Sequence, residues 1–402
     1  MNFRNKYHIL SHKEKVPEKF AATISLSDHQ KAADYNSAKS NLSSVSMIVD
    51  TIVLLAWTIG GGLSYLRSFE MKFMGNSSPI ILDLVLIILF MVINFIVNLP
   101  FSLYQTFILE EKFGFNKTTF KLFLTDIGKV TALFIVLGLP LIYALIYIMN
   151  SLGTLWWFYA FAFMSLVQLL MLYIYPTFIA PLFNKFKLLE DNILIEKVEI
   201  LLKEIGFSHS GIYVMDASTR SSHGNAYFTG FGKNKRIVFF DTLLHGTNAN
   251  ESLQTDEVIA ILAHELGHYK LKHVFKGMIL SFILSFVGFF IFGKFLNQTQ
   301  FFYIFKFNEI SNGIGIILFT LLLPLFTFYL TPIFSLISRK HEFEADDFAS
   351  KHAKASDLIS SLVKMYKDNA SSLTPDPLYA KFYYSHPPAL IRIEHLEKNI
   401  KN

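Results

Sequence analysis

The chain contains no cysteine among its 402 residues. Disulfide bonds, thiolate zinc sites and cysteine nucleophiles are therefore all excluded. Charged side chains are also scarce, since they make up 17% of the residues while 52% are hydrophobic. A soluble protein of this length rarely carries so little charge, because its surface must be solvated. The composition therefore indicates a membrane protein.

The excess of positive charge is small, with a net charge of +5. Membrane proteins concentrate Lys and Arg in their cytoplasmic loops, which accounts for such an excess. No basic run is interleaved with aromatic residues, as a nucleic-acid-binding surface would require. We therefore expect the lipid bilayer, and no nucleic acid, as a partner.

Six stretches reach the roughly 20 apolar residues that a helix needs to cross a bilayer. They cover residues 45–66, 80–103, 130–149, 154–175, 277–296 and 313–336. Segments rich in Lys and Arg precede the first stretch, separate the second from the third and the fourth from the fifth, and follow the sixth. Six crossings place all four segments on one side, which the positive charges predict to be cytoplasmic. The expected fold is an α-helical multi-pass membrane protein with its C-terminus in the cytoplasm.

The long loop over residues 176–276 is expected to form a small α/β unit. Residues 193–205 have the apolar spacing of a helix, and residues 211–215, 226–230 and 236–240 are short β-rich runs separated by turn residues. A further helix is predicted to begin near residues 250–251. We accordingly divide the chain into a membrane region of four spans (1–185) and a metallopeptidase region with two further spans and a tail (186–402).

Residues 264–268 read His-Glu-Leu-Gly-His. Two residues four apart share a helix face, so His264 and His268 can bind one metal ion. Zinc lowers the pKa of a bound water to about 7, and Glu265 is placed to take its proton. This pattern predicts one zinc ion per chain, although two histidines on a solvated helix would give the same letters.

The third ligand must come from elsewhere, because the metzincin positions for Gly and His hold Leu271 and Val274. A site of two histidines and one glutamate is the known alternative. The best candidate is the acidic segment of residues 342–347, Glu-Phe-Glu-Ala-Asp-Asp. Glu342 and Asp346 share a helix face there, while Glu344 points elsewhere. Spacing alone does not choose between Glu342 and Glu344.

Beyond the zinc motif, the chain resembles the integral-membrane CaaX prenyl protease 1 family of type I zinc endopeptidases. Matching segments include 110–117 (Glu-Glu-Lys-Phe-Gly-Phe-Asn-Lys), 175–185, 220–230 (Arg-Ser-Ser-His-Gly-Asn-Ala-Tyr-Phe-Thr-Gly), 235–244 and 384–388 (Tyr-Ser-His-Pro-Pro). The resemblance implies a gluzincin-like fold and usually seven spans, one more than the six expected here, because family members usually carry another membrane helix before the segment that matches residues 15–39.

The resemblance also implies roles for individual residues. Glu342 would be the third ligand, and Asp346 would orient a ligand histidine. Asn225 would open an edge strand that binds the substrate peptide. His386 would stabilise the oxyanion, unless it only fixes a turn. Arg392 would contact substrate, or form a structural ion pair instead.

The implied activity is hydrolysis of peptide or protein substrates, including prenylated C-terminal CaaX sequences, in the bacterial inner membrane or the endoplasmic reticulum membrane. One alternative is a quality-control protease of the bacterial heat-shock type, whose members usually have fewer spans. Another is a catalytically inactive membrane scaffold, which would be expected to have lost Glu265 or a ligand.

Overall fold

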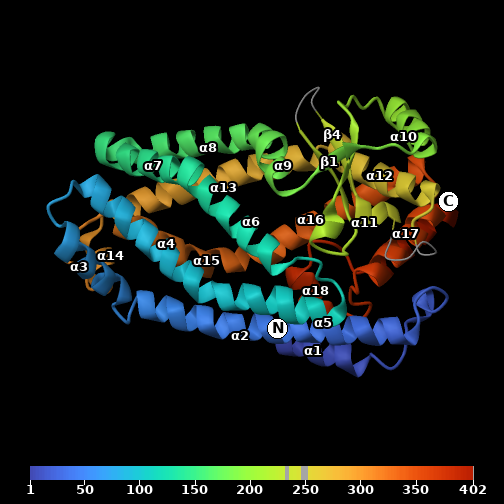
Figure 1. Cartoon of the computed structure of the whole chain (residues 1–402), viewed down its shortest axis with the longest axis horizontal. Helices are drawn as coiled ribbons and strands as arrows, with labels where there is room; N and C mark the ends of the chain where they lie inside the picture. The colour runs from blue at the N-terminus through green and yellow to red at the C-terminus, as the bar shows by residue number, and fades with distance from the viewer. Residues whose placement is uncertain (231–234, 246–251, 402) are drawn as a thin grey trace.

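The computed structural model describes residues 1–230, 235–245 and 252–401. Figure 1 shows an elongated molecule in which the long helices run along its length and a small sheet lies toward one end. Six helical segments among the described residues are long and apolar enough to cross a membrane. The prediction of a helical multi-pass membrane protein is thereby confirmed.

The first 185 residues are almost entirely helical. In this half α4 packs against α7, and α7 packs against α8. Two helices of the second half join them: α13 (His273–Leu296) packs against α8, and α15 (Asn312–Thr327) packs against α4. The elements of this half are α1 (Asn2–Ser11), η1 (Glu18–Phe20), α2 (Leu26–Trp57), α3 (Gly62–Met74), α4 (Pro79–Tyr104), η2 (Gln105–Glu110), α5 (Glu111–Phe113), α6 (Phe120–Leu133), η3 (Phe134–Gly138), α7 (Leu139–Ser151), η4 (Gly153–Leu155), α8 (Trp156–Ile174), η5 (Tyr175–Ile179) and α9 (Ala180–Phe183).

The predicted first span, residues 45–66, is wrong in its bounds. Helix α2 begins at Leu26 and ends at Trp57, and the chain turns through Gly61 before α3 starts. Gly61 has a φ of 78°, a left-handed conformation that favours glycine. The apolar run continues across this turn, so hydropathy alone did not reveal where the helix ends.

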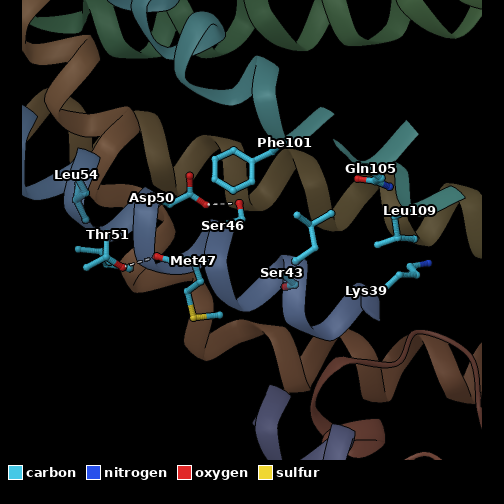
Figure 2. A pocket seen from close by; sticks show the side chains of 12 residues that line it. Lys39, Ser43, Ser46, Met47, Asp50, Thr51, Leu54, Phe101, Gln105 and Leu109 are labelled. Atoms are coloured by element: carbon cyan, nitrogen blue, oxygen red, sulfur yellow. Dashed lines mark hydrogen bonds between the residues drawn. The ribbon is translucent and has the colours of Figure 1, made fainter. Parts of the chain in front are cut away.

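The longer α2 includes a polar half, which lines a pocket of about 560 Å³ together with α4, η2 and Leu325 (Figure 2). Asp50 accepts a hydrogen bond from Ser46 Oγ at 3.2 Å inside this pocket. Polar groups of membrane helices usually face the bundle interior or a cavity. The pocket places Ser46 and Asp50 of α2 beside residues of α4 and η2.

The second half contains a sheet of four strands in the order β1-β2-β4-β3. Strands β2 and β4 are parallel, and β1 and β3 are antiparallel to their neighbours. The three predicted runs correspond to β2 (Ile212–Met215), β3 (Ala226–Thr229) and β4 (Arg236–Phe240), while β1 (Phe186–Leu188) was not predicted. Strand β3 is last in this order and therefore lies at one edge of the sheet. Its register with β4 pairs Ala226 with Phe239 and Thr229 with Arg236.

Helices cover the sheet and complete the second half. Residues of α10, β4, α12 and α17 form one buried apolar cluster beneath the sheet. The remaining elements are α10 (Asn192–Ile205), η6 (Ala217–Thr219), α11 (Asp241–His245), α12 (Thr255–Lys270), α13 (His273–Leu296), α14 (Thr299–Ile304), α15 (Asn312–Thr327), η7 (Phe328–Leu330), α16 (Thr331–His352), α17 (Ala355–Asp368), α18 (Pro377–Tyr383) and α19 (Ala389–Lys401). The predicted helix over 193–205 is confirmed as α10, whereas the predicted helix start at 250–251 lies outside the described residues.

Candidate metal centre

Helix α12 carries the His-Glu-Leu-Gly-His segment. The side chains of Gln254 and Glu257 form a reciprocal capping box that satisfies backbone N–H groups at its start. Apolar residues bury most of the helix against the sheet and against α16. One face therefore presents His264 and His268, whose Nε2 atoms lie 3.3 Å apart.

Helix α16 brings a carboxylate to the same point. Glu342 Oε1 lies 3.3 Å from His268 Nε2, and Glu342 Oε2 lies 3.5 Å from His264 Nε2. Oε2 is buried and has no hydrogen bond partner. Ligand atoms about 2 Å from a tetrahedral zinc ion are separated by roughly 3.3 Å. The three side chains thus have the donor types and spacing that fit a metal ion.

Asp346 lies one turn beyond Glu342 and accepts a hydrogen bond from His264 Nδ1 at 2.8 Å. This contact leaves His264 Nε2 free to face the carboxylate of Glu342. Burial and the Arg392 guanidinium lower the pKa of His264, but hydrogen bonds to Asp346 and Glu342 outweigh both and raise it to about 9. The centre therefore strongly attracts a cation.

Arg392 on α19 is 6% exposed and its guanidinium forms a two-pronged ion pair with Asp346, at 2.9 Å from Nε and 2.5 Å from Nη2. Its Nη1 also lies 3.5 Å from Glu342 Oε2. Burial lowers the pKa of Arg392, but the two carboxylates outweigh burial and raise it. This geometry favours the ion-pair alternative over direct contact with substrate, because the guanidinium is enclosed and already paired.

Glu265 follows the first ligand histidine and is partly buried. Burial raises the pKa of its carboxyl group, while His264 and His268 act in the opposite direction. A carboxyl group with a raised pKa is suited to accept and later return a proton near neutral pH. With neutral histidines, the carboxylates of Glu265, Glu342 and Asp346 and the single guanidinium of Arg392 leave two negative charges, which a divalent cation would neutralise.

His386 lies in the turn between α18 and α19, with its Nε2 atom 3.4 Å from Glu342 Oε1. Its side chain is 64% exposed, so it can contact a substrate. Ser385 Oγ lies 3.0 Å from the other ring nitrogen. The structure therefore brings His386 to the solvent side of the cluster, within reach of a bound substrate.

Asn225 immediately precedes the edge strand β3, and its carbonyl oxygen accepts a hydrogen bond from Phe240 N at 3.0 Å. Among the described residues, no strand pairs with the outer side of β3. The strand packs against α12, which carries the two histidines. An extended peptide added at this edge would therefore run beside the helix of the metal centre.

Two further side chains, His273 and Glu344, lie beside the centre, and spacing alone had left Glu344 open as the third ligand. His273 Nδ1 lies 2.9 Å from His268 Nδ1, and His273 Nε2 lies 2.9 Å from Glu344 Oε2. The sequence contained only a weak signal for this contact, a histidine five residues after His268. Glu344 thus faces His273, whereas Glu342 faces both histidines of the motif.

Comparisons with known proteins agree with this architecture. Residues 6–185 match the family model described as CAAX prenyl protease N-terminal, five membrane helices, and residues 188–400 match Peptidase family M48. The CAAX prenyl protease 1 homolog of Homo sapiens is 35% identical, over 95% of this chain and 88% of its own length. CAAX prenyl protease 1 of Saccharomyces cerevisiae is 40% identical, over 75% of this chain and 69% of its own length.

The crystal structure of S. mikatae Ste24p superimposes with a TM-score of 0.89 at 33% identity, covering 98% of this chain and 96% of that one. The family models together span nearly the whole chain, so the resemblance noted in the sequence is confirmed. The chain belongs to Peptidase family M48 and is a membrane-embedded metalloprotease of the CAAX prenyl protease type.

Proposed function

We propose that this protein is a zinc-dependent endopeptidase that removes the last three residues of prenylated CaaX sequences. The observation that carries the proposal is the triangle of His264, His268 and Glu342 with Glu265 next to the first histidine. The names of the relatives support the substrate class, because the human and yeast proteins are called CAAX prenyl proteases.

Zinc is the metal that this donor set supports best. Two imidazole nitrogens and one carboxylate oxygen form a known catalytic zinc site that leaves a position open for water or substrate. When bound there, zinc would lower the pKa of a water molecule and polarise the scissile carbonyl. His264, His268 and Glu342 would hold the ion, and Asp346 would keep His264 in the tautomer that offers Nε2.

The remaining steps belong to the side chains around the centre. Glu265 takes a proton from the attacking water and passes it to the leaving amine, as its raised pKa favours. His386 donates a hydrogen bond to the oxygen of the scissile carbonyl as negative charge develops on it. Arg392 holds Asp346 in place and balances its buried charge.

The substrate would bind as an added strand on β3, starting beside Asn225. Backbone hydrogen bonds hold such a strand with little regard to its side chains, which suits a protease that accepts varied CaaX sequences. We place the metal centre on the cytoplasmic side, because the four segments rich in Lys and Arg share that side under the positive-inside rule.

The test is cleavage of a fluorogenic peptide with a farnesylated CaaX end by the purified protein in detergent. Wild type is compared with Glu265→Gln, which removes the proton acceptor and leaves the three metal ligands in place. Asp256→Asn is the matched control, since it makes the same acid-to-amide change on an exposed part of α12. Metal content is measured in every sample.

We expect cleavage by wild type and Asp256→Asn, inhibition by a chelator with recovery on adding zinc, and loss of activity in Glu265→Gln at unchanged zinc content. If wild type cleaves only an unfolded protein in a Glu265-dependent way, the metalloprotease mechanism stands and the prenylated substrate does not. Equal behaviour of wild type and Glu265→Gln on every substrate would contradict the mechanism.

A further inference from the structure

The two histidines of the metal centre are held in different ways. His264 Nδ1 meets a carboxylate directly, because Asp346 Oδ1 lies 2.8 Å away. His268 Nδ1 meets a third histidine, His273, at 2.9 Å. We propose that His273 and Glu344 are positioning residues that orient His268 for metal binding, through a chain of hydrogen bonds from carboxylate to histidine to ligand. This inference rests on the proposed metal centre.

The backbone brings His273 to this position through a sharp turn. Helix α12 ends at Lys270, and Lys272 adopts a left-handed conformation with a φ of 58°. Helix α13 then begins at His273 and leads the chain away from α12. The first side chain of α13 therefore points back at the last turn of α12, where His268 lies. A non-glycine residue in this conformation is uncommon, so the surrounding contacts must hold the turn.

The hydrogen bonds that link His268, His273 and Glu344 allow only one arrangement of their protons when His268 binds a metal. If His268 offers Nε2 to a metal, its single proton is on Nδ1 and is donated to His273 Nδ1. His273 must then carry its own proton on Nε2, where it donates to Glu344 Oε2 at 2.9 Å. Every donor meets an acceptor, with two neutral imidazoles and one carboxylate. These hydrogen bonds fix His268 in the tautomer with its proton on Nδ1, which leaves Nε2 to bind the metal.

The surroundings shield His273, the middle residue of this series of hydrogen bonds, from water. The side chain of His273 is 4% exposed, and Glu344 is 34% exposed. The ring of His341 lies parallel to that of His273, with centroids 4.0 Å apart and an interplanar angle of 9°. Because His273 is buried, water does not readily take its place, so the loss of His273 would leave His268 Nδ1 without its acceptor.

The same stack argues against a second metal ion held by His273, His341 and Glu344, although their ligand atoms lie within 4.8 Å of one another. An imidazole nitrogen binds a metal along the plane of its ring. Two parallel rings 4.0 Å apart place their nitrogen lone pairs in separate planes, so the two rings do not converge on one ion. The direct contact of His273 with Glu344 also occupies His273 Nε2.

The test measures zinc affinity by chelator competition on the full chain in detergent. His273→Phe keeps a ring that can stack on His341 but removes the acceptor, so we expect zinc to bind 10- to 100-fold more weakly. His273→Asn places an amide oxygen near the position of Nδ1 and should restore most of the affinity. His341→Phe is the matched control, since it changes the other ring of the stack and leaves the hydrogen-bonded chain intact; we expect no change.

Glu344→Ala, at a partly exposed position, provides a second route that does not disturb the stack, and a smaller weakening is expected. His264→Ala separates the two levels of the argument. If His264→Ala keeps its zinc, the proposed metal centre itself is wrong. If His264→Ala loses zinc while His273→Phe and Glu344→Ala bind it as wild type does, only the positioning role is wrong. Two zinc ions in wild type and one in His273→Phe would identify His273 as a ligand and overturn the inference.

Discussion

The metal centre and the junction between the two halves of the chain both gather polar side chains from distant segments, but by different means. In the metal centre the side chains come from α12, α16, α19 and the turn between α18 and α19, and helix geometry sets their spacing. At the junction, which we define as residues 110–118 with residues 220–225, extended segments pair directly. Lys117 N donates to Arg220 O at 3.1 Å, and Ser222 N donates to Phe115 O at 3.2 Å.

The junction leads straight into the edge strand β3. His223 stacks on Phe115 with ring centroids 4.4 Å apart, and its Nδ1 lies 3.2 Å from Asn369 Oδ1. The Glu110 carboxylate accepts a hydrogen bond from the hydroxyl of the buried Tyr35 at 2.8 Å and lies 3.7 Å from His223 Nε2. Two of the segments that carried the family resemblance, 110–117 and 220–230, thus meet each other, and neither contains a ligand of the proposed metal centre. The comparison separates residues that hold the metal from residues that hold the strand beside it.

The largest expected effect is at the metal centre. Asp346→Ala would leave the enclosed guanidinium of Arg392 without its partner, and unpairing a buried ion pair costs about 3–5 kcal/mol of stability. It would also remove the acceptor that orients His264. We expect a lower melting temperature in detergent together with loss of bound zinc. Asp347→Ala, the neighbouring acid, is the control, and equal effects of the two changes would contradict the assignment.

A smaller loss is expected where α12 and α16 touch. A side chain at Gly267 would place its Cβ 3.0 Å from Ala345 Cα and 3.2 Å from Ala345 O, which are backbone atoms that cannot rotate away. Gly267→Ala should therefore force the helices apart, cost about 1–3 kcal/mol of stability and reduce activity, because His268 and Glu342 lie on those helices. Thermal melting and peptide cleavage measure both effects. Gly277→Ala has no neighbouring atom within 4 Å and should change neither.

The junction should respond differently. His223→Phe keeps a ring against Phe115 and removes the hydrogen bond to Asn369, which is worth about 1 kcal/mol. If the junction holds the edge strand, KM for the peptide should rise by roughly fivefold with zinc content unchanged. A drop in zinc content with KM unchanged would show that the two regions are not separate in this way.

The smallest effect is expected at an exposed ion pair on the far side of α12. Lys197 Nζ lies 2.5 Å from Asp256 Oδ1, and both side chains are largely solvated. Surface pairs of this kind contribute little because water and salt screen them. Lys197→Ala should leave the melting temperature, zinc content and activity unchanged within error. A clear drop in any of the three would mean that the start of α12 affects the centre more than the burial of α12 suggests.

The membrane helices and the α/β unit could largely be predicted from local patterns. Apolar runs of about 20 residues and short β-rich runs between turn residues each identify an element by its own composition. Two elements were missed or misplaced for a physical reason. Strand β1 has three residues and is defined only by its pairing with β2. The end of α2 depends on a turn at Gly61, which lies inside a stretch that is apolar on average on both sides of the turn.

The sequence by itself determined that His264 and His268 can share one metal ion, because residues four apart on a helix always share a face. Spacing left Glu342 and Glu344 open, since either can be turned toward α12 depending on how α16 is rotated about its axis. Only the tertiary structure decided this, because α16 packs on α12 with Ala345 next to Gly267 and with Glu342 turned toward both histidines. The same packing encloses Arg392, turns His273 onto His268 and brings His386 to the centre, because contacts between distant segments follow from how helices pack and not from their sequence spacing.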